Sequence, residues 1–227
     1  MKEKYAITFN KILEVEKRGL DYYKQVFESA PYSEEEGWGF SSVEEDEYIL
    51  SATLLKRTPT SIQEWNIQQK DFEKKVIYIY TQFSFSIDFR LGLIYVQGTI
   101  SALNKIKSIL RNILKGAFSY DDITLSSVVL SPQFRSNDFQ SSLKEISIND
   151  FNYKEGIIGK YVAKIHNQEN AIEIVDKYFE KISKIKIHFY SQSTSFELIA
   201  SRCNSLTIIC ECDDFFLIMD KVKNFIK

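Results

Sequence analysis

An alternating run between Lys75 and Arg90 constrains the fold of this chain more than any other sequence feature. Odd positions from Ile77 to Phe89 are almost all apolar, whereas even positions from Val76 onward are mostly polar or amphipathic. A period of two residues places the two sets on opposite faces of a strand. One polar face is typical of antiparallel sheet that meets water. The run therefore predicts one long strand, or two with a bend.

The rest of the chain shows both strand and helix periods. Strands are predicted at 48–57, 93–97, 123–130, 160–166, 185–190, 196–200 and 206–211, and helices at 10–29, 101–115, 170–182 and 214–226. Asn10 is expected to cap the first helix and Pro31 to stop it. Asn170 and Glu173 resemble a capping box for the third. These elements predict an α+β protein, mainly antiparallel sheet with helices packed on one face.

A weak internal repeat suggests how the elements are organised. Shifting the chain by 112 residues places 87–115 over 199–227 with five identities in 29 positions, and strand, turn and helix coincide. The prediction is two similar β-β-α halves, at 1–116 and 151–227, joined by a Ser-rich region at 117–150. Shared architecture without duplication, and a single compact domain, remain open alternatives.

The charge is divided unevenly along the chain. The formal net charge is −2, but residues 1–50 hold 6 Lys/Arg against 12 Asp/Glu, which leaves 23 against 19 for the remainder. The acids gather at 33–47, around Trp38 and Phe40, each of which follows a glycine. Repulsion between like charges and the flexibility of glycine predict a mobile acidic loop.

A protein-binding function follows from this loop. The acids would steer a basic protein partner, and the two aromatic side chains would anchor it. The alternative for Trp38 is that it folds back into the core. The predicted partner-binding residues are Trp38, Phe40, Glu34, Glu35, Glu36, Glu44, Glu45, Asp46 and Glu47. The first hypothesis is therefore a non-catalytic interaction module or subunit, of an adaptor or immunity type.

The second hypothesis is binding of single-stranded nucleic acid. If the strands that carry Tyr78 and His188 share a sheet, their polar side chains form one surface with rings for base stacking and cations for phosphates. A helix arc with bases and no acids adds phosphate contacts. The residues concerned are Tyr78, Tyr80, Arg90, Lys105, Lys107, Arg111, Lys115, Lys186, His188 and Tyr190.

Catalysis is the third hypothesis, because no catalytic motif, phosphate-binding glycine loop or metal-ligand spacing is found. Cys210 and Cys212 lie two apart in an apolar strand, which is not the spacing of a zinc knuckle. We therefore expect no cofactor and no metal.

An odd number of cysteines favours a reducing compartment. Apolar runs are far shorter than the ~18 residues that span a bilayer, so we expect a cytoplasmic protein without membrane contact. The oligomeric state is not predicted.

Overall fold

The structure is a computed structural model that describes residues 1–14, 18–68, 70–131, 140–154, 157–191 and 194–226. Elements alternate along the N-terminal half in a strand-helix-four strands-helix order. They are β1 (Glu3–Glu14), α1 (Leu20–Glu28), β2 (Trp38–Asp46), β3 (Ile49–Asn66), β4 (Asp71–Asp88), β5 (Leu93–Gln97) and α2 (Ile100–Ile113).

The C-terminal half has a related order with an additional helix between its strands. Its elements are β6 (Phe118–Asp121), α3 (Leu125–Leu130), β7 (Gln140–Lys154), β8 (Ile157–Lys164), α5 (Gln168–Tyr178), β9 (Ile182–Tyr190), β10 (Ser195–Ser201), β11 (Ser205–Cys210) and α6 (Phe215–Ile226), with single 3₁₀ turns at Phe179–Lys181 and Cys212–Asp214.

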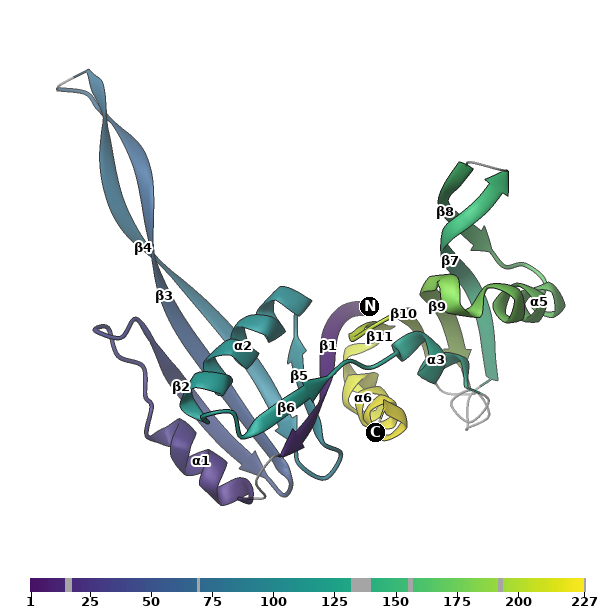
Figure 1. Cartoon of the computed structure of the whole chain (residues 1–227), viewed down its shortest axis with the longest axis horizontal. Coiled ribbons are helices and arrows are strands. Elements are labelled where there is room, and N and C mark those ends of the chain that lie inside the picture. Colours follow the sequence, from purple (N-terminus) through teal and green to yellow (C-terminus); the bar gives the residue numbers. More distant parts are fainter. Residues whose placement is uncertain (15–17, 69, 132–139, 155–156, 192–193, 227) are drawn as a thin grey trace.

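All these strands join one sheet across both halves. The order is β2-β3-β4-β5-β1-β11-β10-β9-β7-β8, and β6 pairs with the end of β1. Each pairing between strands is antiparallel. Figure 1 shows β1 between the two halves, with α1 and α2 over the N-terminal half and α3, α5 and α6 beside the C-terminal half. The α+β class predicted from the sequence is confirmed.

The alternation in β4 sets the core of the N-terminal half. Phe83, Phe85 and Ile87 are buried, and their face of the sheet is covered by α1 and α2. Tyr23 and Phe27 of α1 are completely buried in the same cluster. Burial of apolar side chains at alternate strand positions fixes the register, because a slip of one residue would expose all of them.

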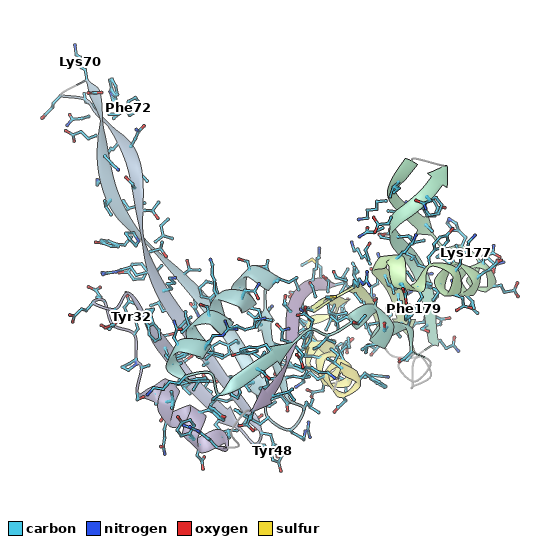
Figure 2. All side chains as sticks on the ribbon, in the orientation of Figure 1. Tyr32, Tyr48, Lys70, Phe72, Lys177 and Phe179 are labelled. Atoms are coloured by element: carbon cyan, nitrogen blue, oxygen red, sulfur yellow. The ribbon has the colours of Figure 1, made fainter. Side chains whose placement is uncertain are left out.

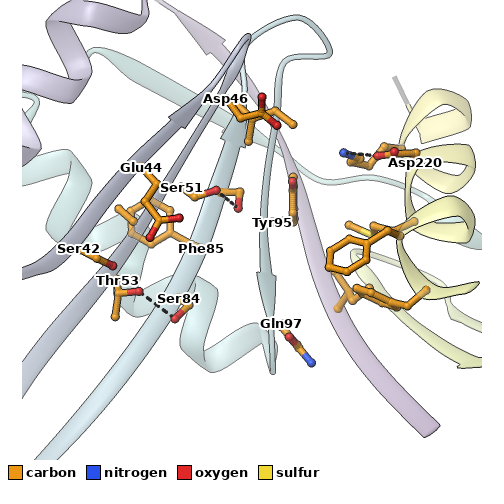
Figure 3. A pocket seen from close by; sticks show the side chains of 18 residues that line it. Ser42, Glu44, Asp46, Ser51, Thr53, Ser84, Phe85, Tyr95, Gln97 and Asp220 are labelled. Atoms are coloured by element: carbon orange, nitrogen blue, oxygen red, sulfur yellow. Dashed lines mark hydrogen bonds and ion pairs between the residues drawn. The ribbon is translucent and has the colours of Figure 1, made fainter. Parts of the chain in front are cut away.

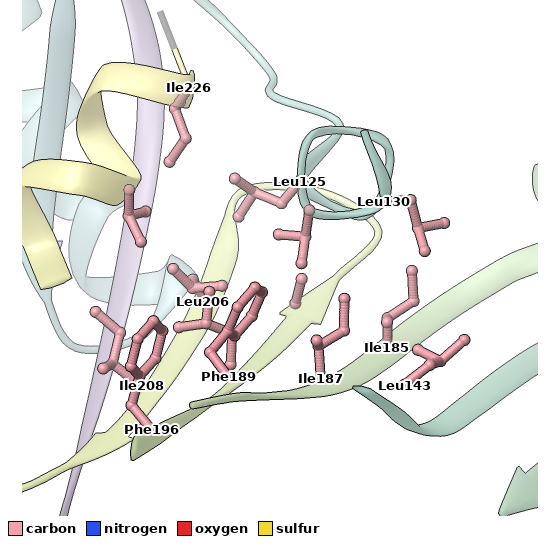
Figure 4. Packing of buried hydrophobic residues seen from close by; sticks show 14 of the residues in the cluster. Leu125, Leu130, Leu143, Ile185, Ile187, Phe189, Phe196, Leu206, Ile208 and Ile226 are labelled. Atoms are coloured by element: carbon pink, nitrogen blue, oxygen red, sulfur yellow. The ribbon is translucent and has the colours of Figure 1, made fainter. Parts of the chain in front are cut away.

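The helices cover one face of the sheet on one side of β1 and the opposite face on its other side. Ile7 and Phe9 point into the C-terminal core with Leu206 and Ile208 of β11, whereas Ile12 belongs to the N-terminal core. Figure 4 shows α3 and α6 above the apolar face of β9–β11. Each half thus has its helices on one face, but the two halves use opposite faces of the continuous sheet.

The repeat in the sequence coincides with this arrangement. The shift of 112 residues places β5 over β11 and α2 over most of α6. Both strands run antiparallel to β1, one on each side of it, and the helices that follow them cover opposite faces. A rotation by half a turn about the axis of β1 would place β5 on the position of β11, and it would move α2 to the face of the sheet that α6 covers. Common architecture is sufficient to explain it, and gene duplication stays a prediction.

Two predicted elements and one predicted helix cap are wrong. Residues 10–14, predicted as the first turns of a helix, are the end of β1, because the strand that starts at Glu3 continues through them, and α1 begins only at Leu20. The predicted strand at 123–130 contains α3 instead; a short apolar run fits either structure. The cap of α5 is Asn167, whose side chain accepts a hydrogen bond from the Glu169 amide at 2.8 Å, and not Asn170.

The strands β3 and β4 continue far beyond their neighbours. β2 pairs with β3 only as far as Lys56, and β5 pairs with β4 only from Phe85 onward. Ten residue pairs, from Arg57 with Tyr80 to Asn66 with Asp71, therefore form a two-stranded ribbon that we call the arm. At ~3.3 Å per residue it extends roughly 30 Å. Figures 1 and 2 show it projecting from the sheet.

Candidate binding groove

The floor of a groove is the face of the N-terminal sheet opposite α1 and α2. Side chains at alternate positions of β3 and β4 face this side, and they are mostly hydroxyls. The hydroxyls of Ser51 and Ser86 are 2.9 Å apart, and those of Thr53 and Ser84 are 3.1 Å apart. Each pair joins two strands across the sheet, and either oxygen of a pair can donate. Tyr95 continues the floor onto β5.

One wall of the groove is α6. Ile218, Val222 and Ile226 of this helix belong to the C-terminal core. Met219 belongs to that core and also lines the groove, together with Phe215 and Phe216. Phe216 is 76% exposed. The groove has a volume of about 490 Å³, which lies within the ~300–1,000 Å³ usual for binding sites. Figure 3 shows the hydroxyl floor on one side and α6 on the other.

Acidic side chains line the rim and one end of the groove. Glu44 and Asp46 of β2 and Asp220 of α6 contribute carboxylates, and Lys223 contributes the single base of the lining. Lys223 is already occupied, because its ammonium lies 2.8 Å from Asp220 Oδ1. Glu44 and Asp46 form no ion pair with any residue that the structure describes. The lining therefore carries a net charge of −2.

Lys223 keeps its charge although it is buried. Burial alone would lower the pKa of its ammonium group, but the hydrogen bond to Asp220 and the neighbouring Tyr95 and Asp88 raise the pKa above its usual value. The ammonium also lies 5.5 Å from the centre of the Tyr95 ring, within the range of a cation–π contact. Lys223 thus ties α6 to the floor of the groove.

The two predicted aromatic anchors pack toward the core of the N-terminal half. Phe40 is only 5% exposed and stacks on Phe27 of α1 with 4.7 Å between ring centres. Trp38 is half-buried against the same core. Residues 38–46 are a strand rather than a loop, because burying these rings and Val43 stabilises pairing with β3. The exposed role predicted for Phe40 is therefore wrong, and Trp38 follows the alternative of folding toward the core.

The predicted acids fall into three groups. Glu44 and Asp46 line the groove. Glu45 points to the opposite face, where it pairs with Lys24 of α1 at 3.0 Å, and Glu34 lies 3.8 Å from Arg57. The others remain exposed at the turns on either side of β2, and they are Glu35, Glu36 and Glu47. Alternation along one strand divides the set between two faces.

The predicted nucleic-acid surface is not assembled in the structure. β4 and β9 share the sheet, but β5, β1, β11 and β10 lie between them, a separation of roughly 24 Å at ~4.8 Å per strand. Tyr78 and Tyr80 share the face of Ser84, whereas His188 alternates with Ile187 and lies on the other face. That assignment is corrected: the two groups share a sheet and not a surface.

His188 has local partners on its own face. Its ring lies 5.8 Å from that of Tyr190, and the adjacent Lys186 forms an ion pair with Glu197 at 2.9 Å. Burial and, secondarily, the nearby lysines keep the pKa of His188 below its usual value, although Glu197 opposes this. Arg90, by contrast, is at the end of β4, where it lines a second cavity with Asp88.

The predicted bases on α2 and directly after it do not form a single phosphate-binding arc. Lys107 donates a hydrogen bond to Asn10 Oδ1 at 3.0 Å, and burial lowers the pKa of its ammonium group. Lys105 lies 5.5 Å from the centre of the Phe83 ring. Arg111 and Lys115 are exposed. Part of the arc thus stabilises the fold.

Sequence reasoning missed the groove and the arm. The hydroxyls at Ser84 and Ser86 were visible as a polar strand face, but their proximity to α6 depends on β1 bringing the two halves together.

Among the described residues, no cluster of three or more His, Cys, Asp or Glu side chains is placed to hold a metal. The three cysteines are free thiols. None of the described helices combines the length and apolarity needed to span a membrane.

No protein-family model matches the chain, and no curated protein matches it in sequence.

Proposed function

We propose that this protein is a non-catalytic interaction module whose arm binds a partner protein, with the acids of β2 favouring a basic partner. The observation that carries this proposal is the aromatic face of the arm. Alternate positions of its two strands place Pro59 and Trp65 on the same face as Phe72, Tyr78 and Tyr80. Trp65 is 50% and Phe72 is 60% exposed.

The arm has little to stabilise it when no partner is bound. Two-stranded ribbons are marginally stable in water when no third strand or helix covers them. This one is held by cross-strand contacts, including the Trp65 and Phe72 rings at 5.0 Å and the Lys75–Glu64 ion pair at 2.8 Å. Exposed apolar groups of this kind mark interaction sites in proteins, and aromatic residues dominate the energy of interfaces.

The proposal is tested by affinity purification from the native cell extract at moderate salt after nuclease treatment. The wild-type chain is compared with the double variant Trp65→Ser/Phe72→Ser and with the control Phe179→Ser, which removes an exposed ring outside both the arm and the groove. We expect a stoichiometric protein with the wild type and the control, and its loss with the arm variant at an unchanged melting temperature. Equal recovery with all three chains would contradict the proposal.

Nucleic-acid binding is the second candidate, because Tyr78 and Tyr80 are exposed and the Arg57 guanidinium lies 4.5 Å from the centre of the Tyr78 ring. Rings and a cation on one ribbon can stack on and neutralise a single strand. Bound nucleic acid that is released steeply by salt, and lost in Tyr78→Ala/Tyr80→Ala, would favour this candidate over the first.

A further inference from the structure

We propose that the groove between α6 and the hydroxyl face of β2–β5 binds an extended peptide segment of the partner that carries a lysine or arginine beside an apolar side chain. This inference rests on the proposed function, because it names the chemistry of the partner and assigns it a second contact site besides the arm.

The first step is the charge of the rim. Glu44 and Asp46 occupy alternate positions of β2, so both carboxylates lie on the groove side of the strand. Both are exposed, and within the described residues neither has a cationic partner. The one base of the lining is bound to Asp220. A cationic segment would therefore find two uncompensated carboxylates, whereas a phosphate or an acidic peptide would be repelled.

The second step is a buried carboxylate at the end of the groove. Asp88 is 0% exposed, and its Oδ1 accepts a hydrogen bond from the Leu91 amide at 3.0 Å. Its Oδ2 has no hydrogen-bond partner among the residues described. Asp88 lines a cavity of about 300 Å³ that adjoins the groove, since Asp46 and Ile49 line both.

Buried polar atoms almost always have a partner, and each one left without a partner destabilises the protein. An ammonium or guanidinium group from a ligand supplies the missing donor, and both carry several N–H groups. Asp46 lines the same cavity, so an entering cation would meet carboxylates from β2 and β4. Arg90 is the single base of this lining. This unsatisfied oxygen distinguishes the site from an ordinary acidic surface.

The third step is the apolar wall. Phe216 is largely exposed and faces the groove with Phe215 and Met219. An apolar side chain next to the cation would bury part of this surface. The hydroxyls of the floor, such as Ser51 and Thr53, offer both donors and acceptors to a peptide backbone. Charge, apolar surface and hydrogen-bonding groups together favour a peptide over a small cation alone.

The test is selection of random heptapeptides displayed on phage against the immobilised full-length chain. The enriched peptides are then synthesised with a fluorescent label, and their affinities are measured by anisotropy. We expect enrichment of lysine or arginine next to an apolar residue. We further expect Glu44→Lys/Asp46→Lys to weaken binding of the synthetic peptides by at least roughly tenfold, because attraction is replaced by repulsion.

Two further variants separate the site from general charge. Glu173→Lys/Asp176→Lys makes the same change of charge on exposed positions of α5 and should leave the affinity unchanged. Phe216→Ala removes the exposed ring of the wall and should weaken binding without lowering the melting temperature. Enriched peptides that lack basic residues, or equal affinity for the rim variant and the α5 control, would overturn the inference.

Failure here is distinguishable from failure of the proposed function. The first possible result is that Glu44→Lys/Asp46→Lys and Phe216→Ala still bind the partner, whereas Trp65→Ser/Phe72→Ser does not. This result would support the interaction module and contradict the peptide site in the groove. If the arm variant keeps the partner and the groove variants lose it, the assignment of the arm is the one that is overturned.

Discussion

Four polar residues join the two halves of the molecule beside β1. The Asp122 Oδ1 atom accepts hydrogen bonds from Asn10 Nδ2 at 3.0 Å and from Asn204 Nδ2 at 2.6 Å, and Asn10 in turn accepts one from Lys107. Asn204 has a φ of 61°, in the left-handed region that asparagine adopts more readily than most residues. These donors lower the pKa of the Asp122 carboxyl, so the network stabilises its ionised form.

This lowered pKa predicts a pH dependence of stability. Because the pKa of Asp122 is lower in the folded than in the unfolded chain, its contribution is complete above the unfolded value near 3.8 and is lost as the pH falls through the folded value. Asp122→Asn should therefore reduce the free energy of unfolding by about 1 kcal/mol at pH 6, and by progressively less below pH ~4. Denaturant titrations at several pH values measure this difference.

The control for this prediction is Asp121→Asn, which changes the neighbouring carboxylate, a group with no side-chain hydrogen bond among those described. Its effect should be small and should not follow the same pH profile. A loss in Asp122→Asn that stays constant from pH 6 to pH 3 would show that the ionised carboxylate is not what the network stabilises.

At the scale of elements, the arm and the sheet differ in how their side chains are used. In the part of β4 that lies within the main sheet, Phe83, Phe85 and Ile87 belong to the core. In the arm, apolar groups such as Val76 and Ile79 are exposed. None of the described residues of the arm belongs to either buried cluster. The arm should therefore contribute little to the stability of the sheet.

Shortening the arm tests this separation. Replacing residues 61–76 by Asn-Gly, a sequence that favours a two-residue hairpin turn, joins the paired residues Thr60 and Ile77. We expect the free energy of unfolding to change by less than about 1 kcal/mol, since none of the described side chains in this range is buried. Partner capture should be lost. Thermal and denaturant unfolding of the shortened chain measure the first effect.

A matched deletion inside the core supplies the contrast. Phe27→Ala removes a completely buried ring and should cost about 3–5 kcal/mol. If shortening the arm destabilised the chain as much as Phe27→Ala does, the arm would have to be part of the folding unit, and the proposed division of roles would be wrong.

Local patterns were sufficient for most elements but not for their relations in space. Alternation identified β4, and helical spacing identified α2 and α6, because one buried face repeats along each. The same reasoning failed at 10–14, which was assigned to a helix, because Ile12 fits the helical period as well as the end of strand β1. It also failed for Phe40, because an aromatic side chain among acids has no local signal that distinguishes an exposed anchor from a ring stacked on a helix.

The candidate site was harder to predict because it depends on long-range pairing. Glu44 and Asp46 were identified as binding residues from charge alone, without the alternation that sends Glu45 to the other face. Asp88 and the exposed ring of Phe216 were not identified as binding residues, since the two adjoining cavities that they line are formed only when the chain folds. The arm was hidden for a related reason: the sequence predicts a long strand, but not where its neighbours stop.

At the scale of the whole molecule, β1 is shared by both cores. It pairs with β5 on one side and β11 on the other, and its Ile7 and Phe9 lie in the C-terminal cluster although they come from the first residues of the chain. A fragment that lacks β1 would expose the apolar face of β11 and part of α6. The unit that folds around the C-terminal core therefore includes β1, which is distant from the rest of that core in the sequence.

We accordingly expect the fragment 122–227 to lack a cooperative thermal transition, because Leu206 and Ile208 lose the side chains that cover them. Circular dichroism and the dispersion of amide NMR signals measure this. Fusing residues 1–14 to its N-terminus through a Gly/Ser linker should restore a transition. A sharp transition in the unfused fragment would mean that the C-terminal half folds by itself.

The position of α6 has a consequence for how the two halves communicate. One side of this helix bounds the groove, and the other carries Ile218, Val222 and Ile226 into the core of the opposite half. Any occupant that favours one position of α6 must change the energy of that core, and by reciprocity the state of the core must change the affinity of the groove. Because α6 belongs to both, binding in the groove and the stability of the C-terminal core are thermodynamically coupled.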